Sequence, residues 1–294
     1  MTTIGLYVNP NKAEALRAAE RAAVFLHTNG ASCMAHHDIV TRMSADAAAH
    51  VHASKMAELV KSSDVVISFG GDGTMLNCAH HLVGTDIPIM GVNIGKLGFL
   101  AEFSVLELEE SLANLLSGSY RVVDRSTLCC TLNLEAEERV VHVLNEFVLE
   151  KHATSRMIHV RAEVDQHIIG DYRADGLLLT TPTGSTAYSL SCGGPIITPS
   201  AQVFCLTPVS PHTLTLRPLI INDTSDVRCV VLAESSDVSI VADGQHAGVL
   251  KSGDAIVFRK SSHVVKLIKK SSSTYFDLLR EKLLWSADAV NPTR

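Results

Sequence analysis

Two patterns of hydrophobic and polar positions divide the chain near residue 118. Before that point, short apolar runs at residues 4–8, 65–69 and 87–92 alternate with stretches whose apolar residues recur at helical spacing. Such runs are typical of buried strands, and their alternation with helices predicts a doubly wound parallel sheet. Because ligands of these sheets bind at the carboxyl ends of the strands, functional residues are expected in the loops that follow the runs.

The same periodicity predicts the helices. One helix ends near Asn29–Gly30, a second, Ala-rich helix is expected over about residues 44–60, and a third over residues 106–116. Near the end of the chain, Thr274 and Asp277 have the spacing of a helix-start pair. That last helix is too short to be stable alone, so it is expected to pack back on one of the domains.

After residue 118 the pattern changes to short, β-branched runs separated by turn signals such as Asp243-Gly244. The expected strands are residues 139–150, 158–164, 227–232, 238–241, 255–259 and 264–268. We therefore predict an α/β domain over residues 1–118 and an all-β, sandwich-like domain over residues 119–270. A C-terminal helix and tail would occupy residues 271–294.

Composition narrows the class of protein. The 294 residues are 46% hydrophobic and 19% charged, with a net charge of −6, which argues against a disordered chain and against a dedicated nucleic-acid binder. No stretch offers the ~20 unbroken apolar residues of a membrane span. No basic residue precedes Lys12, so no signal peptide is predicted, and we expect a cytoplasmic protein.

Cysteines and histidines give no metal or disulfide signature. The seven cysteines form no Cys-x-x-Cys pair, so reduced, mostly buried residues are expected. Adjacent histidines at residues 36–37 and 80–81 are expected to point in different directions, and no His-Glu-x-x-His stands near them. We therefore predict no protein-bound metal.

A glycine-rich loop follows the second apolar run. Gly70, Gly71 and Gly73 let the backbone turn sharply, and Thr74 would open a helix whose free amides favour phosphate. Asp72 would repel phosphate, unless it holds a hydroxyl or a metal ion beside it. The other interpretation is a plain strand-to-helix turn capped by Asp72. Neither Gly-x-Gly-x-x-Gly nor the P-loop motif is present.

A second polar segment, residues 175–189, runs from a strand into a loop rich in Thr, Pro, Gly and Ser. Its hydroxyls and amides offer neutral donors for hydroxyls or phosphates, and Tyr188 offers a flat face for a ring. The hydroxyls belong to Thr183, Ser185, Thr186 and Ser189.

Asn145 and Glu146 interrupt an apolar run. Two polar side chains in such a strand need partners, which a ligand could supply. The alternative is one internal pair that satisfies both.

Four segments in this order resemble the NAD kinase family, of the bacterial type that uses ATP or polyphosphate. They are Gly-Gly-Asp-Gly-Thr at residues 70–74, Gly-Lys-Leu-Gly-Phe-Leu at 95–100, Asn-Glu at 145–146 and the 175–189 segment. The first is shared with diacylglycerol, sphingosine and phosphofructo-kinases, whereas the last makes the match specific. The resemblance covers nearly the whole chain. It implies an α/β domain, a β-domain and a site between them. It also implies transfer of a phosphoryl group to the 2′-hydroxyl of the adenosine ribose of NAD, and a homodimer or homotetramer.

Residue by residue, the resemblance makes Asp72 the proton acceptor for that hydroxyl and places Gly73 in the same binding loop. It assigns Asn145 and Glu146 to contacts with the dinucleotide, and Asp175 to groups on the nicotinamide side. The phosphate-binding loop would consist of Gly70, Gly71, Gly73 and Thr74. The dinucleotide pocket would be lined by Thr186, Ala187, Tyr188, Ser189, Leu190 and Ser191.

Four further residues have an alternative interpretation. Arg156, Arg173 and Gln245 match family contacts by position, but they also fit surface or interface side chains. Phe99 would pack on the adenine or belong to the core. Arg173 lies two positions before Asp175 and would share its face. From there it could occupy space or fix Asp175 by a charge-assisted contact. Asp175 would then favour the cationic ring of oxidised NAD over the neutral ring of NADH.

The proposed chemistry needs few groups from the protein. Phosphoryl transfer depends on positioning and charge neutralisation, so Asp72 would orient the hydroxyl while Mg²⁺ arrives with the nucleotide. The donor, ATP or polyphosphate, stays open. One alternative is a lipid kinase with a membrane-facing basic surface formed by Arg259, Lys260, Lys266, Lys269 and Lys270. The other is a non-catalytic NAD(P)-binding sensor, which could dispense with Asp72.

Overall fold

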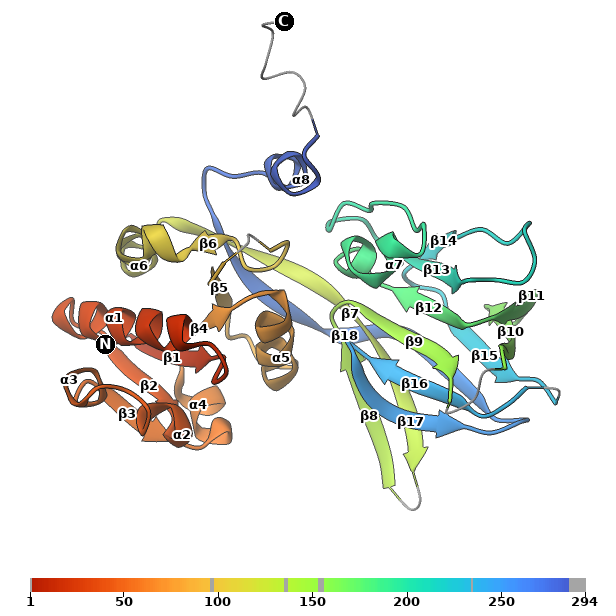
Figure 1. Cartoon of the computed structure of the whole chain (residues 1–294), viewed down its shortest axis with the longest axis horizontal. Helices are drawn as coiled ribbons and strands as arrows, with labels where there is room; N and C mark the ends of the chain where they lie inside the picture. Colours follow the sequence, from red (N-terminus) through yellow and green to blue (C-terminus); the bar gives the residue numbers. More distant parts are fainter. Residues whose placement is uncertain (1, 96–97, 135–136, 153–155, 234, 286–294) are drawn as a thin grey trace, which may run out of the picture. The chain divides into compact units, whose positions relative to one another are not determined.

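The computed structural model describes residues 2–95, 98–134, 137–152, 156–233 and 235–285. The chain divides into two units (Figure 1). The first unit comprises Met1–Asp124 and Val265–Arg294, and the second comprises Arg125–Val264. The chain therefore leaves the first unit once and returns to it near its end.

This division differs from the one expected at residues 118 and 270. Both crossings fall inside long strands, β7 (Tyr120–Leu134) and β18 (Ala255–Lys270). The last residues of β18 pair in parallel with the first unit's sheet, through Leu267 and Ile89. Sheet pairing thus assigns residues 265–270 to the α/β unit, although their sequence reads like the strands before them.

The first unit contains a parallel sheet in the order β3-β2-β1-β4-β5, which the alternating pattern predicted. Its further elements are β1 (Thr3–Val8), α1 (Ala13–Thr28), β2 (Ser32–His36), α2 (His37–Val40), α3 (Ala45–Ala48), β3 (Val51–Ser54), α4 (Met56–Ser62), β4 (Val65–Gly70), α5 (Asp72–Leu82), β5 (Ile89–Asn93), β6 (Phe103–Ser104), a 3-10 turn (Val105–Glu107), α6 (Leu108–Ser117) and α8 (Tyr275–Leu283).

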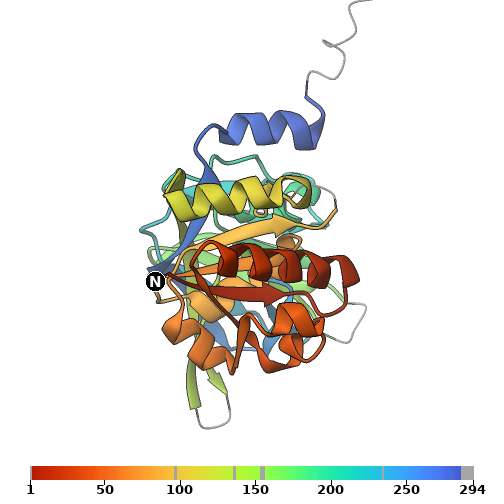
Figure 2. The same cartoon turned by 90° about the vertical axis from the view of Figure 1, so that its left-hand side faces the viewer.

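Alternate side chains of the central strands separate the two faces of this sheet. Ile67 and Phe69 of β4 point into a core shared with α1 and α6, whereas Val66 lies outside that cluster. The buried face of α1 is mostly alanine, so this helix lies close to the strands. Figure 2 shows α1 across the sheet with α6 beside it. The helix α5 contacts β4 and β5.

The single helix expected over residues 44–60 is wrong. The structure has two short helices, α3 and α4, separated by the strand β3, which pairs in parallel with β2 from Cys33↔Val51 to His36↔Ser54. The alanines give this segment high helix propensity, but the backbone hydrogen bonds gained at the sheet edge outweigh it.

The second unit consists of two sheets packed face to face, as the β-rich pattern predicted. One sheet has the order β14-β13-β12-β9-β16-β17, and the other contains β11-β10-β15-β18 with the β7–β8 hairpin. Phe147 of the first and Phe258 of the second meet in the core with ring centroids 5.0 Å apart. The further elements are β8 (Glu137–Val143), β9 (Glu146–Lys151), β10 (Ile158–Val164), β11 (His167–Ala174), β12 (Gly176–Thr180), a 3-10 turn (Gly184–Thr186), α7 (Tyr188–Ser191), β13 (Val203–Val209), β14 (Leu219–Asn222), β15 (Val227–Val231), β16 (Val238–Ala242) and β17 (Gln245–Leu250).

Two strand predictions need correction. The run at residues 139–150 is not one strand, because it breaks at Leu144–Asn145 and its halves β8 and β9 join different sheets. Conversely, the runs at residues 255–259 and 264–268 belong to the single strand β18. The polar residues between those two runs continue a strand instead of forming a turn.

Other expectations agree with the structure. All seven cysteines are free, and most of them are buried. The helix-start pair before α8 is confirmed, since the hydroxyl of Thr274 accepts a bond from the amide of Asp277 and the Asp277 carboxylate accepts one from the amide of Thr274. Within the described ranges, no helix has the length and apolar character that crossing a membrane requires.

Candidate active site

Asp72 stands at the first position of α5, directly after β4, and its carboxylate is held by the backbone of a distant loop. Oδ2 accepts a hydrogen bond from the amide of Phe99 at 2.7 Å, and Oδ1 accepts bonds from the amides of Leu100 and Ala101, both at 3.1 Å. A carboxylate offers about four acceptor positions. Amides of the described residues therefore use three of these positions, and among those residues no donor uses the remaining one on Oδ2.

The close approach of this loop explains one glycine of the 95–100 motif. A Cβ atom at Gly98 would lie 1.8 Å from Oδ1 of Asp72, so any other residue would displace the carboxylate. Lys96 and Leu97 of the same motif lie outside the described residues. Phe99 is half-buried, and the ammonium of Lys282 in α8 lies 5.6 Å from the centroid of its ring.

The glycine-rich loop has a packed side and an open side. A Cβ atom at Gly70 would lie 2.1 Å from the hydroxyl of Thr74, whereas a Cβ atom at Gly71 or Gly73 would have no tertiary neighbour within 4 Å among the described residues. The amide of Met75 makes a helical bond to the carbonyl of Gly71, so the amides before it lie at the open end of α5. This end can accept an anion.

Asn9 belongs to the same loop cluster, and the sequence analysis missed it. Its side-chain amide donates to the hydroxyl of Thr74 at 3.2 Å, and its backbone amide donates to the carbonyl of Phe69. Asn9 directly follows β1, which lies beside β4. The rule that sites form at the carboxyl ends of parallel strands could have found it.

In the second unit, a carboxylate holds three successive amides in the same way. Oδ2 of Asp243 accepts from the amide of Leu144 at 2.7 Å, and Oδ1 accepts from the amides of Asn145 and Glu146 at 2.8 and 3.0 Å. Asp243 has a φ of 46°, a left-handed conformation that Asp and Asn tolerate better than most residues. These contacts fix the break between β8 and β9, and the sequence identified Asp243 only as a turn residue.

The beginning of the 175–189 segment packs against the same break. The hydroxyl of Thr181 donates to the carbonyl of Leu144 at 2.6 Å, and the hydroxyl of Thr180 donates to that of Asn145 at 3.0 Å. A Cβ atom at Gly184 would lie 2.4 Å from the carbonyl oxygen of Asn145. The Asn-Glu and Thr-Pro-Thr-Gly segments therefore form one interlocked cluster within the second unit.

Glu146 is not satisfied by an internal pair. It is 7% exposed, and its Oε2 atom has no hydrogen-bond partner among the described residues. Burial, together with the nearby negative charge of Asp243, raises the pKa of Glu146 to about 8. The raised pKa disfavours the ionised form of Glu146, and Oε2 is a buried polar atom that still needs a partner.

The hydroxyls of the 175–189 segment have different roles. That of Ser185 donates to the carbonyl of Pro182 at 2.7 Å, and that of Ser189 pairs with the hydroxyl of Thr207 at 2.9 Å, so both stabilise the loop itself. The hydroxyl of Thr183 is buried and has no partner within the described ranges. Thr186, Ala187 and Leu190 are partly exposed, and Ser191 is exposed.

Carboxylates surround Tyr188, which is 42% exposed. Burial raises the pKa of Tyr188, and Cys192 and the carboxylates of Glu150, Asp175 and Glu146 raise it further. Glu150 and Asp175 thus contribute negative charge near this ring.

Asp175 and three other predicted contact residues lie at the surface of the second unit. The carboxylate of Asp175 pairs with the ammonium of Lys151 at 3.0 Å, and both side chains are 40% exposed. Asp175 therefore has a charged partner, Lys151, that the sequence did not suggest. Arg173, Arg156 and Gln245 are exposed side chains.

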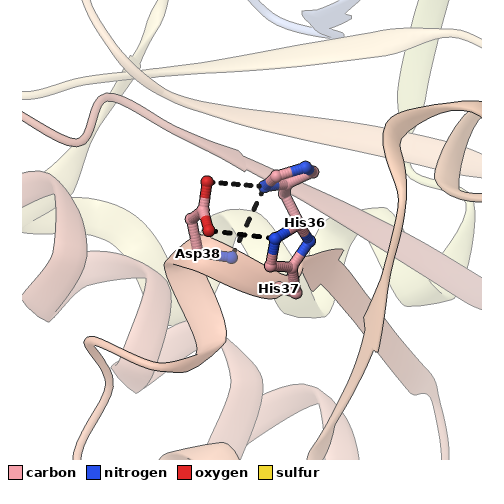
Figure 3. A group of neighbouring side chains, drawn as sticks. All are labelled: His36, His37 and Asp38. Atoms are coloured by element: carbon pink, nitrogen blue, oxygen red, sulfur yellow. Dashed lines mark hydrogen bonds and ion pairs between the residues drawn. The ribbon is translucent and has the colours of Figure 1, made fainter.

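The expectation that adjacent histidines point apart is wrong for His36 and His37 (Figure 3). Nδ1 of His36 and Nε2 of His37 lie 3.5 and 3.0 Å from the two carboxylate oxygens of Asp38, and the ring centroids are 4.2 Å apart. The strand β2 ends at His36, and the chain turns directly into α2. This turn brings the rings together on the surface, where Asp38 partners both.

Comparisons with known proteins agree with this geometry. The family model "ATP-NAD kinase N-terminal domain" matches residues 4–120, and "ATP-NAD kinase C-terminal domain" matches residues 144–270. An NAD kinase of Prosthecochloris aestuarii is 37% identical over 280 residues, which cover 95% of this chain and 96% of the relative. An NAD kinase of Geobacter sulfurreducens is 42% identical over 224 residues, covering 76% of this chain and 79% of the relative.

Two solved structures share the fold. Yeast NADH kinase complexed with NADH superimposes with a TM-score of 0.88 at 24% identity, covering 100% of this chain and 89% of the other. An NAD kinase from Archaeoglobus fulgidus in complex with ATP gives a TM-score of 0.76 at 23% identity, covering 97% and 99%.

Proposed function

The chain belongs to the NAD kinase family, and from this we propose that it transfers a phosphoryl group from a nucleoside triphosphate to the 2′-hydroxyl of the adenosine ribose of NAD, giving NADP. The observation that supports this most strongly is the carboxylate of Asp72. Three backbone amides fix it beside the open end of α5, and one acceptor position is not used by any described residue.

In this proposal Asp72 orients the acceptor hydroxyl and receives its proton. In a loose phosphoryl-transfer transition state the hydroxyl loses its proton late, so positioning contributes more than basicity. A carboxylate fixed by three amides meets that need, because it does not have to reorganise as the reaction proceeds.

The phosphates would lie at the open side of the glycine-rich loop, along Gly71 and Gly73. A magnesium ion would neutralise the triphosphate charge when it is bound. The only group of His, Cys, Asp and Glu side chains with metal-binding spacing among the described residues is His36, His37 and Asp38. That group is rich in nitrogen, whereas Mg²⁺ prefers oxygen ligands. We propose that the phosphates would chiefly hold the ion.

The dinucleotide contacts belong to the second unit. Oε2 of Glu146 and the hydroxyl of Thr183 are buried, have no hydrogen-bond partner among the described residues, and would be satisfied by a ribose or base. The carboxylates around Tyr188 suit the cationic nicotinamide ring. We propose Asn145, Arg156, Arg173, Gln245 and residues 186–191 as further contacts, in accordance with the family pattern.

A donor and acceptor assay tests the proposal. The protein with Mg²⁺, NAD and ATP should form NADP, and a parallel reaction with polyphosphate identifies the second donor. Matched incubations with NADH and with diacylglycerol test the other acceptors. If no NADP forms with either donor while phosphate appears on a lipid, the proposal is wrong.

The structure offers little support for the lipid-kinase alternative. Each of the five basic residues that would form its membrane face is paired with a carboxylate. The pairs are Arg259–Asp226, Lys260–Asp223, Lys266–Asp86, Lys269–Glu102 and Lys270–Glu107. Charges paired in this way are poorly suited to attract anionic lipids.

We also propose that the protein is a homodimer or homotetramer. The sheet edge at β14 supports this, because Leu219 and Ile220 are exposed on it together with Leu214 in the preceding loop. Exposed apolar edges are commonly covered by a partner. Light scattering of the parent protein and of Ile220→Lys tests the assembly. The cytoplasmic location stays a prediction.

A further inference from the structure

Lys269, near the end of β18, is a charged residue in the interior of the first unit. Its side chain is 6% exposed, and its ammonium lies 3.1 Å from Oε2 of Glu102, whose side chain is 12% exposed. Lysines are almost never buried to this extent without a specific partner, and the pair takes no part in the function proposed above.

The ammonium of Lys269 also donates a hydrogen bond to the carbonyl oxygen of Leu100 at 3.2 Å. That carbonyl and the amide of Ala101 belong to the same peptide group, and this amide donates to Oδ1 of Asp72 at 3.1 Å. Lys269 and Asp72 therefore bind opposite ends of one peptide. A cation at the carbonyl end polarises the peptide and makes its N–H a stronger donor.

Glu102 keeps the ammonium in this position. One of its oxygens pairs with Lys269, and the other accepts bonds from the amide of Lys270 at 3.3 Å and from the hydroxyl of Ser273. Burial alone would raise the pKa of Glu102, but Lys269 and these hydrogen bonds outweigh it and lower the pKa. The carboxylate stays charged, and its partners from the returning chain fix both side chains.

We propose that Lys269 is a positioning residue for phosphoryl transfer, which acts on Asp72 through the Leu100–Ala101 peptide and is held in place by Glu102. This inference rests on the function proposed for Asp72. It assigns a task in the reaction to the segment that returns to the first unit after the β-sandwich. A purely structural role for the buried pair is the competing explanation.

The decisive variant is Lys269→Met combined with Glu102→Gln. Removing the lysine alone would leave a buried, unpaired carboxylate and would confuse destabilisation with loss of positioning, whereas the double change leaves no unpaired charge. We expect the double variant to fold with a Tm near that of the parent. Its kcat should fall roughly tenfold at a nearly unchanged KM for NAD, since the loss affects the reacting geometry and not the binding.

Two single variants act as controls. Lys266→Met lies three residues earlier on the same strand and breaks the exposed pair with Asp86, so it should leave kcat at the parental value. Glu102→Gln removes the charged partner of Lys269 but leaves the Leu100 carbonyl and the new amide oxygen as acceptors for its ammonium, so this variant should lose less kcat than the double variant, and its Tm measures the cost of the lost ion pair. If the double variant retains the parental kcat, or if Lys266→Met loses as much as it does, the proposal is wrong.

A thermodynamic cycle with Asp72→Asn separates this proposal from the one on which it rests. If Lys269 acts through Asp72, the double change should lower kcat far less in the Asp72→Asn background than in the parent. Equal losses in both backgrounds would overturn the inference. If Asp72→Asn itself keeps the parental kcat, the role proposed for Asp72 fails instead.

A readout without turnover completes the test. The amide proton resonance of Ala101 should shift upfield in the Lys269→Met, Glu102→Gln variant because its hydrogen bond to Asp72 weakens, while Lys266→Met leaves it in place. An unmoved Ala101 resonance in the double variant would contradict the polarised peptide.

Discussion

Asp72 in the first unit and Asp243 in the second hold their neighbours in the same manner. Each carboxylate accepts three bonds from three successive backbone amides, two on Oδ1 and one on Oδ2. Each thereby fixes a segment that is distant in the sequence. A carboxylate that binds three amides is therefore a device for shaping the backbone, and this feature alone does not identify a catalytic group.

The surroundings of the two carboxylates differ. Asp72 begins a helix, where the open amides favour the approach of an anion, and Gly73 beside it has free space. Asp243 occupies a turn with a positive φ next to Glu146, whose pKa it helps to raise. In the proposed function the first carboxylate would meet the reacting hydroxyl, whereas the second would prepare Glu146 for binding. Function follows from what lies around the carboxylate.

Asp72→Asn is the strongest test of the different roles proposed for Asp72 and Asp243. The substitution removes the negative charge and the proton acceptor, and its NH₂ group faces at least one of the three amides that the carboxylate bound, so kcat should fall by about 10²–10⁴. NAD binding should remain. Steady-state kinetics with NAD and ATP, together with calorimetric titration of NAD, check both expectations. A change confined to KM would make Asp72 a binding residue.

The second largest expected effect is on the pH dependence of stability, and it is produced by Glu146→Gln. Since the pKa rises from 4.5 in the unfolded chain to about 8 in the folded one, its contribution to stability is complete below pH 4.5. It is lost as the pH rises towards and through 8. The loss is on the order of 5 kcal/mol. Glu146→Gln cannot titrate and should lack this loss.

Melting curves of the parent and of Glu146→Gln between pH 5 and 9 measure the difference. The Tm of the parent should fall relative to that of the variant as the pH rises. Parallel curves would show that Glu146 is already ionised at neutral pH in the folded protein.

Asp243→Asn is expected to have a smaller effect. The substituted NH₂ group faces one of the three amides that the carboxylate bound, so the free energy of unfolding should fall by roughly 1–3 kcal/mol. Loss of the negative charge also removes one cause of the raised pKa of Glu146. The variant should therefore lose the stability contributed by Glu146 at a lower pH than the parent does.

Asp165→Asn is a matched control for that change. Asp165 also has a positive φ, of 49°, and its carboxylate accepts bonds from the amide of Asp226 and the hydroxyl of Ser225 in the same unit. It should lower the Tm without moving the pH dependence. The same pH shift in both variants would contradict a specific coupling of Asp243 to Glu146.

The sites around Asp72 and Asp243 also show which features could be predicted from the sequence and which could not. The alternating pattern predicted the parallel sheet, and the loop with Asp72 stood out because its three glycines are close together. Asp243 looked like an ordinary turn residue, because its amide partners Leu144–Glu146 lie about a hundred positions away and appear only after folding. Lys269 looked like surface charge for the same reason. Propensity failed at β3 and at the break before β9, where pairing across the sheet decides the conformation.

The smallest expected effect concerns the choice between NAD and NADH. The carboxylate of Asp175 pairs with Lys151, and because both side chains are 40% exposed, the pair contributes less than about 1 kcal/mol. In Lys151→Met the carboxylate is freed and should attract the cationic ring of NAD more strongly. The ratio of kcat/KM for NAD to that for NADH should then rise about twofold to fivefold. Asp175→Ala should lower the same ratio, and Arg173→Gly tests whether the arginine contributes as the sequence suggested. Ratios that stay at the parental value in both Lys151→Met and Asp175→Ala would show that this carboxylate does not face the nicotinamide, while the assignments of Asp72 and Glu146 would remain intact.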